Sequence, residues 1–266
     1  MPFIKLNNSQ FYYELHGQPS NKALVLISGF GADHTYWEPL LTDLVKEYYV
    51  LVFDNRAVGQ TLDHHHEPLT IEQFADDTVN LFQALELKKP HIVGQSMGGA
   101  IALAIAQQYP HKIDRACTMA GPAKWRLNTV AGLRSMHLAY RDSASFDALF
   151  QAELGWVYGE RFLKNVEKIA ALKQLLQSNP YPQSLQNQAR QLHAIEAFDL
   201  SDKLENIQTN ILILGGEEDI LCTPADCQFL DKHLPNSTLV MLEKVAHAAR
   251  LEAPEETFMA LFDFFA

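Results

Sequence analysis

The sequence contains few cysteines and no long apolar run. Its 266 residues include no uninterrupted apolar stretch of about 18 residues, the length that a membrane-spanning helix needs. The opening residues, MPFIKLNNSQ, have neither the apolar core nor the small-residue cleavage site of a secretory signal. Cys117, Cys222 and Cys227 form an odd, sparse set, which favours reduced thiols over a disulfide framework. We therefore expect a cytoplasmic protein that does not bind a membrane.

The chain also lacks an excess of basic residues. Its formal net charge is −11 and its pI is about 5.4, whereas binding to a nucleic-acid backbone needs a basic face. We therefore expect no nucleic-acid partner. Hydrophobic residues make up 47% of the chain, which is enough apolar material for the core of one α/β domain with an insertion.

Short apolar runs alternate with longer stretches of helical spacing in the first half of the chain. The runs predicted as strands are ALVLIS (23–28), YYVLVFD (48–54), HIVGQ (91–95) and IDRACTMA (113–120). Strands that are apolar on both faces and separated by helices indicate a parallel sheet covered on both sides. The first 16 residues are predicted to add an antiparallel pair of strands at one edge.

This alternation stops after Pro122 and resumes near residue 198. In between, helical stretches dominate, and we find no convincing strand. Strands return at NILILGG (210–216) and STLVMLE (237–243), and a last helix follows at 254–265. The sequence therefore predicts a core formed by residues 1–121 and 198–266, interrupted by a helical cap over residues 122–197.

A serine stands between two glycines where a predicted strand meets a predicted helix. Residues 94–98 read GQSMG, a G-x-S-x-G pattern. In this context the pattern is typical of a nucleophile elbow, whose sharp turn holds the serine in a strained conformation. A side chain at Gly94 or Gly98 would collide with neighbouring backbone, so both glycines are expected to be required. Ser96 then lies at a helix N-terminus, where free N–H groups favour negative charge.

A serine nucleophile needs a base, and the base needs an orienting carboxylate. On this architecture the acid and then the histidine follow the serine in sequence. His247 lies between the last predicted strand and the last helix, so its loop leaves the same edge of the sheet as the serine. One strand earlier, Asp219 has the favoured spacing, whereas Glu217 and Glu218 are expected in solvent. The preceding strand end, 117–125, carries no carboxylate.

Acyl chemistry also requires hydrogen-bond donors for an oxyanion. The elbow supplies the backbone N–H of Met97. The loop SGFG (28–31) follows the first buried strand, and the N–H of Phe30 between its two glycines is the predicted second donor.

Five segments of the sequence together resemble the α/β-hydrolase superfamily. They are SGFGADHTYW (28–37), FDNRAVGQT (53–61), VGQSMGGAIA (93–102), GGEEDILCTP (215–224) and VAHAARLEAPEE (245–256). The resemblance covers most of the chain outside the insertion. It implies a mostly parallel sheet of about eight strands, helices on both faces, and a helical cap over the active site. Many relatives have His where this chain has Ser28, and Gly where it has Ala57 and Ala246, but no catalytic group is missing.

The resemblance implies cleavage in two steps through a Ser96–His247–Asp219 triad, without a cofactor or a metal. The serine argues against epoxide and carbon–halogen cleavage, for which relatives generally use aspartate. We expect hydrolysis of a carboxylic ester with a small or medium acyl group. Lactones, enol-lactones and C–C bonds remain open as alternatives, as does a ligand receptor with slow turnover. A C–C hydrolase needs a cap group for a second carboxylate, and the candidates are Arg126, Arg134 and Arg190.

Two further features bear on ligands. Residues 121–197 contain nine Lys and Arg against six Asp and Glu, a balance of +3 beside −14 for the remainder. A basic cap would attract an anionic substrate or an acidic carrier protein, as in the pimeloyl-carrier-protein methyl ester esterases that the resemblance includes. The run His64–His66 is predicted to be a solvated loop, because adjacent histidines rarely converge on one metal ion.

Overall fold

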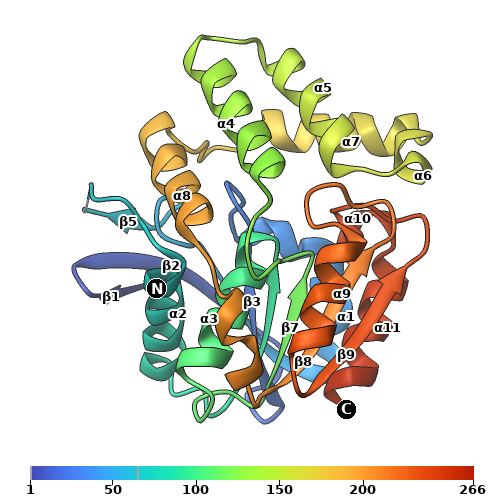
Figure 1. Ribbon diagram of the computed structural model, residues 1–266. Coiled ribbons are helices and arrows are strands. Elements are labelled where there is room, and N and C mark those ends of the chain that lie inside the picture. The colour runs from blue at the N-terminus through green and yellow to red at the C-terminus, as the bar shows by residue number, and fades with distance from the viewer. Residues whose placement is uncertain (1, 65) are drawn as a thin grey trace.

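The computed structural model describes residues 2–64 and 66–266 (Figure 1). Residue 65 lies outside the described residues, so the expectation for the histidine run 64–66 is tested only at its two ends. In the described chain, no helix is long and apolar enough to cross a membrane.

The centre of the molecule is one sheet, parallel along most of its width. Its strands are β1 (Phe3–Leu6), β2 (Ser9–His16), β3 (Lys22–Ile27), β4 (Tyr48–Phe53), β5 (Leu62–Asp63), β6 (His91–Gln95), β7 (Arg115–Met119), β8 (Asn210–Gly216) and β9 (Ser237–Leu242). They pair in the order β1-β2-β4-β3-β6-β7-β8-β9, with β5 added beside β2. The pairs β1–β2 and β2–β4 are antiparallel, and the pairs from β4 to β9 are parallel. The predicted α/β fold and the antiparallel edge are confirmed. The two-residue strand β5 was not predicted, because so short a segment carries no periodicity.

Helices cover both faces of this sheet (Figure 1). One face packs against α2 (Ile71–Ala84), α3 (Met97–Gln108) and α9 (Pro224–His233), and the other against α1 (Glu38–Glu47) and α11 (Pro254–Phe265). The short helices η1 (His34–Trp37), η2 (Ser201–Asn206) and α10 (Ala249–Glu252) complete the loops around them.

The alternation of side chains along β3 shows why both faces are buried. Ala23, Val25 and Ile27 belong to the apolar cluster on the α2–α3 face. Leu24 and Leu26 belong to the cluster on the α1–α11 face. Successive side chains of a strand point to opposite faces of the sheet. A strand with apolar residues on both faces therefore buries all of them only when both faces are covered.

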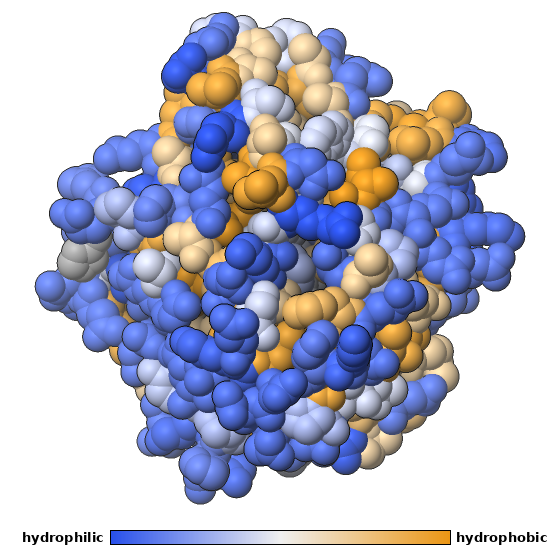
Figure 2. All heavy atoms as spheres, viewed as in Figure 1, coloured by the Kyte–Doolittle hydropathy of each residue, from blue (hydrophilic) through white to orange (hydrophobic). Residues whose placement is uncertain are grey.

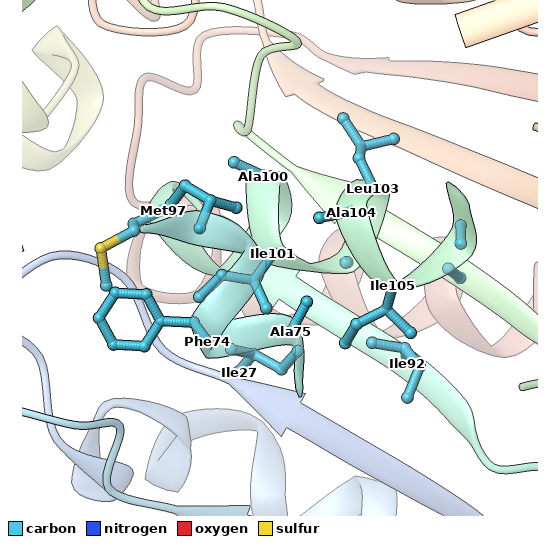
Figure 3. Packing of buried hydrophobic residues seen from close by; sticks show 14 of the residues in the cluster. Ile27, Phe74, Ala75, Ile92, Met97, Ala100, Ile101, Leu103, Ala104 and Ile105 are labelled. Atoms are coloured by element: carbon cyan, nitrogen blue, oxygen red, sulfur yellow. The ribbon is translucent and has the colours of Figure 1, made fainter. Parts of the chain in front are cut away.

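Helix α3 is apolar almost all round, since it is buried between the sheet and α2. Figure 3 shows Ile105 of α3 beside Ile92 of β6, and Met97 extending toward the ring of Phe74 on α2. The residue after Ser96 is therefore fixed in the core, and this holds the start of α3 in place.

Between β7 and β8 the chain forms a layer of helices above the carboxyl ends of the strands (Figure 1). These helices are α4 (Leu127–Arg141), α5 (Phe146–Val157), α6 (Glu160–Leu163), α7 (Val166–Gln177) and α8 (Leu185–Ala197). The segment α5–α7 has its own apolar cluster, which includes Phe150, Tyr158 and Leu172 and packs on Ala248. On the face shown in Figure 2 the apolar surface is scattered in small areas, several of them where this layer meets the sheet domain.

A buried network of charges joins α8 to the sheet domain. The guanidinium of Arg190 is 2.7 Å from the carboxylate of Asp63, which also pairs with Arg56 at 2.9 Å. Arg56 in turn forms a two-pronged ion pair with Asp77 of α2. Arg56, Asp77 and Arg190 are at most 5% exposed, so the charges are compensated within the protein rather than by water.

Candidate active site

Ser96 occupies a strained turn between β6 and α3. Its backbone angles are φ 56° and ψ −116°, a conformation that side-chain-bearing residues rarely adopt. Its N–H donates to the carbonyl of Met119 at 2.8 Å, which ties the turn to β7. A Cβ at Gly94 would lie 1.8 Å from the carbonyl oxygen of Gly98, so no larger residue fits under this turn. These contacts raise the serine above the end of the strand.

Asp219 and His247 form a buried hydrogen-bonded pair. The Nδ1 of His247 lies 2.8 Å from Oδ2 of Asp219, and the two residues are 6% and 2% exposed. The other carboxylate oxygen accepts the backbone N–H groups of Leu221 and Cys222 at 2.8 and 3.0 Å. Because both oxygens are engaged, the carboxylate is fixed in orientation.

The loops that carry the acid and the histidine are joined by backbone contacts. The N–H of Glu218, next to Asp219, donates to the carbonyl of Val245 at 2.9 Å. Both loops follow strands that are neighbours in the sheet, β8 and β9, so their carboxyl ends meet at one edge. Among the described residues, neither Glu217 nor Glu218 forms a hydrogen bond or ion pair with His247, and the side chain of Glu218 accepts the N–H of Glu160 instead.

The elbow and the histidine loop are connected through Gln95. Its side-chain amide donates to the backbone carbonyl of His247 at 3.2 Å, and Gln95 is only 4% exposed. Within the described chain the Ser96 hydroxyl has no hydrogen bond to the imidazole. Such nucleophile–base contacts are often long before substrate binds and shorten in the complex.

In the part of the chain that the structure describes, the backbone N–H groups of Phe30 and Met97 are free near the serine. The amides of Phe30 and Met97 donate no hydrogen bond within the described residues, whereas neighbouring Gly31 donates to Gln191 of α8 at 3.0 Å. A Cβ placed on Gly29 would lie 3.2 Å from the Cβ of Ser96, so this loop runs directly beside the serine. Unpaired donors at this place can bind a developing oxyanion.

Sequence reasoning missed three polar residues that hold these loops. They are Gln95, Gln191 and Glu252, and all are at most 4% exposed. Gln95 stands next to Ser96 in the motif, but nothing in its spacing predicts a contact to residue 247. Gln191 lies in the insertion, 160 residues from its partner Gly31. Contacts of this kind are set by chain packing, which periodicity does not encode.

The residues Asp33, His34 and Asp54 form a compact group whose ligand-type atoms lie within 4.8 Å of one another. Asp54 accepts hydrogen bonds from both the backbone and Nδ1 of His34, at 2.8 and 2.7 Å. Asp33 accepts from Thr35 and from the side chain of Asn179. Although burial opposes it, the Asp54 carboxylate raises the pKa of His34. The group is a hydrogen-bond network that supports the oxyanion loop, and its acceptors are engaged.

The cations of the insertion lie mostly beside carboxylates. The pairs are Lys124–Asp199, Arg126–Asp226, Arg134–Glu196, Arg141–Asp142, Arg161–Glu256, Lys164–Glu160, Lys173–Asp147 and Arg190–Asp63. The three arginines considered for a C–C hydrolase are therefore all paired within the protein. Local pairing also weakens the field that the excess charge would create. Binding of an acidic carrier protein stays a prediction.

The strained serine, the buried acid–histidine pair and the sheet order define an α/β hydrolase. The family model described as alpha/beta hydrolase fold matches residues 22–254, and the chain belongs to this family. The predicted membership is thus confirmed.

Curated relatives match almost the whole chain. A protein of Caulobacter sp. (strain K31) with the name "Putative carbamate hydrolase RutD" is 26% identical over 255 residues, covering 95% of this chain and 94% of that protein. A protein of Stutzerimonas stutzeri with the same name is 28% identical over 266 residues, covering 96% of both. Hydrolase activity is therefore supported.

Solved structures share the fold over its full length. The enol-lactonase from Burkholderia xenovorans LB400 has a TM-score of 0.89 at 23% identity and covers 99% of both chains. A thermophilic esterase from Thermogutta terrifontis has a TM-score of 0.83 at 24% identity, covering 99% of this chain and 96% of that one. At these identities the likeness shows the fold alone.

Proposed function

We propose that the protein hydrolyses carboxylic esters of small or medium acyl groups through an acyl-enzyme. The observation that carries the proposal is the 2.8 Å hydrogen bond between Asp219 and His247. The loop of His247 is in turn hydrogen-bonded to Gln95, which precedes Ser96 in the turn. In the first step His247 Nε2 accepts the proton of the Ser96 hydroxyl while the oxygen attacks the carbonyl carbon. His247 then gives this proton to the leaving alkoxide as the C–O bond breaks.

In the second step a water oxygen attacks the acyl carbon while His247 takes a proton from that water. His247 then gives the proton to Ser96 Oγ as the ester bond to the serine breaks and the carboxylic acid leaves. Asp219 holds the imidazole and stabilises its charged form, and the amides of Phe30 and Met97 bind the oxyanion in both steps. Proton and charge balance within this set of groups, so the proposal requires no cofactor.

A lactone, an enol-lactone or a carbamate presents a carbonyl to the same groups. The names of the relatives and of one structural neighbour favour these as second candidates. Ring opening differs only in that the leaving oxygen stays attached to the acyl part. C–C cleavage and a receptor role remain alternatives that the same assay separates.

The test is steady-state hydrolysis of p-nitrophenyl esters from acetate to decanoate, together with a panel of simple lactones, for the wild type and Ser96→Ala. We expect turnover with an optimum in chain length, and a loss of several orders of magnitude in a folded Ser96→Ala. Near-normal turnover in that variant overturns the mechanism. A single burst without turnover would instead support a receptor, and inactivity on all esters and lactones would leave carbamate hydrolysis and C–C cleavage as the candidates.

A further inference from the structure

The backbone around His247 is held by a carboxylate that lies outside the triad. Glu252 of α10 is 3% exposed. Its Oε1 accepts the N–H groups of Ala246 and Ala248, both at 3.2 Å, and these residues flank His247 on either side. Its Oε2 accepts the N–H of Ala246 at 3.2 Å and that of Gly159 at 2.9 Å.

The same loop is bonded directly to the helical layer. The N–H of His247 donates to the carbonyl of Val157, the last residue of α5, at 3.0 Å. Two residues later, Gly159 donates to Glu252. The His247 carbonyl accepts from Gln95, as described above. Both backbone polar groups of His247 are therefore engaged, one by the elbow and one by the insertion.

The fit between the insertion and this carboxylate is close. A Cβ on Gly159 would lie 2.5 Å from an oxygen of Glu218 and 3.0 Å from Oε2 of Glu252. Arg161 also binds this part of the chain, because its guanidinium donates to the backbone carbonyl of Glu252 at 2.6 Å. The segment Val157–Arg161 thus contacts the histidine loop at several points, and a side chain at residue 159 would displace the carboxylate of Glu218 and press on that of Glu252.

An isolated carboxylate in the interior is costly, and burial raises the pKa of Glu252. The hydrogen bonds from Gly159, Ala246 and Ala248 oppose this rise by favouring the ionised form. A carboxylate with three backbone donors is a rigid anchor, because charge-assisted hydrogen bonds are about twice as strong as neutral ones.

We infer that Glu252 and the segment Val157–Gly159 form one positioning unit that sets the imidazole of His247 for proton transfer. Glu252 touches no reacting atom; it acts by fixing the peptide groups on both sides of the histidine. The insertion thereby contributes to the chemical step and does more than cover the site. Moving this segment away from the sheet domain breaks the bonds of Val157 and Gly159 to the histidine loop. This inference rests on the proposed function of the triad.

The chain offers a matched control for Glu252. Glu218 is also a glutamate that accepts a backbone N–H from this segment, that of Glu160 at 3.0 Å, but it is exposed, and among the described residues its side chain accepts no hydrogen bond from Ala246 or Ala248. Glu252→Gln and Glu218→Gln therefore make the same chemical change at two carboxylates, one that accepts the N–H of Gly159 and one that accepts the N–H of Glu160. Gly159→Ala is the second test variant, since it disturbs the unit without altering Glu252.

The first measurement is kcat and KM on the best p-nitrophenyl ester, at a temperature where each variant is folded by circular dichroism. We expect Glu252→Gln to lower kcat about 10- to 100-fold with KM within about threefold, the range for a catalytic group displaced by about 1 Å. Gly159→Ala should lower kcat in the same way by a smaller factor, and Glu218→Gln should stay within about twofold of the wild type. A purely structural role would lower the melting temperature and leave kcat per folded molecule unchanged.

The second measurement is the far-downfield proton resonance of His247 Nδ1–H, identified by its loss in Asp219→Asn. We expect the resonance to shift or broaden in Glu252→Gln and to remain in place in Glu218→Gln. If Glu252→Gln does not fold, Gly159→Ala carries the same test with the same two readouts.

An unchanged kcat together with an unchanged resonance in a folded Glu252→Gln or Gly159→Ala overturns the inference. Failure of the underlying function is recognised separately, because Ser96→Ala would then retain turnover. An inactive Ser96→Ala beside an unaffected Glu252→Gln would leave the triad in place and remove only this positioning unit.

Discussion

The side chain of Gln95 donates a hydrogen bond to the backbone carbonyl of His247, and this joins two loops that are 152 residues apart in the chain. Gln95 precedes Ser96, so the contact fixes the histidine loop relative to the elbow. Replacing Gln95 with Leu leaves a buried carbonyl without this donor, at a cost of about 1–3 kcal/mol in the free energy of unfolding.

We expect Gln95→Leu to lower kcat at least about tenfold, because the imidazole is no longer held in position relative to the Ser96 hydroxyl. Ester hydrolysis and chemical denaturation of the purified variant measure both effects. Gln208→Leu is the control, since Gln208 also donates to a backbone carbonyl but lies at the surface. Equal kcat values for the two variants would show that the contact has no role in turnover.

Asp219→Asn tests the assignment of the acid. The amide can keep an oxygen toward Leu221 and Cys222, but its NH₂ group then faces Nδ1 of His247 and favours the wrong tautomer. We expect a decrease in kcat of about 10³- to 10⁴-fold with little change in stability. Glu217→Gln, at the exposed neighbour, should be near wild type. If Glu217→Gln or Glu218→Gln had the larger effect, Asp219 would not be the acid.

Gly94→Ala tests the packing under the elbow. The added Cβ would meet the carbonyl oxygen of Gly98 at 1.8 Å, and backbone on both sides must move to relieve the clash. We expect little soluble protein, or a folded variant with greatly reduced activity. Gly155→Ala is the matched control, because among the described residues no atom outside the adjoining backbone of its own helix lies within 4 Å of its Cβ position. Gly155 lies in the last turn of α5, where alanine should stabilise the protein by up to about 1 kcal/mol.

Arg190→Met tests the charge network that joins α8 to the sheet domain. Asp63 would lose one of its two arginines in a buried site, so we expect a loss of about 2–4 kcal/mol in the free energy of unfolding. Arg134→Met removes an exposed ion pair with Glu196 on the same layer and should cost less than about 1 kcal/mol. Similar costs for both would mean that burial of the network does not matter to stability.

We expect the protein to lose stability at acidic pH because of His91. Burial is the main cause that lowers its pKa from 6.5 to about 4, helped by the charge of Lys22. The side chain is stacked on Phe265 and 3% exposed. As the pH falls from 6.5 to about 4, His91 becomes protonated in the unfolded chain but stays neutral in the folded one. The free energy of unfolding therefore falls by up to about 3 kcal/mol.

His91→Phe removes this group and keeps the ring. Lys22 and Arg115 are unchanged in both proteins. Asp114, whose pKa is lowered mainly by its hydrogen bond to Lys22, loses only the smaller contribution of His91 in the variant. Urea unfolding at pH 7.5, 5.5 and 4.5 should show a smaller acid loss in His91→Phe than in the wild type. If the free energy of unfolding fell equally with pH in the two proteins, His91 would not be the cause of the loss.

The sequence by itself carries the order of elements and the candidate triad. Both follow from local rules: apolar runs alternate with helical periods, and Gly94 and Gly98 bracket a serine at a strand-to-helix junction. The positions of Asp219 and His247 follow too, because each comes directly after a strand of a parallel sheet. Such strands place their carboxyl ends at a common edge, so position along the chain already implies proximity.

Only the tertiary structure decided what holds these residues in place. Gln95, Gln191 and Glu252 form hydrogen bonds with backbone groups of other segments. No periodic pattern in the sequence connects these residues with those segments. Backbone amides and carbonyls are the same in every residue, so a sequence does not mark which of them a distant side chain will bind. The short strand β5 and the ion pair between Asp63 and Arg190 likewise form only once the helical layer and the sheet are packed together.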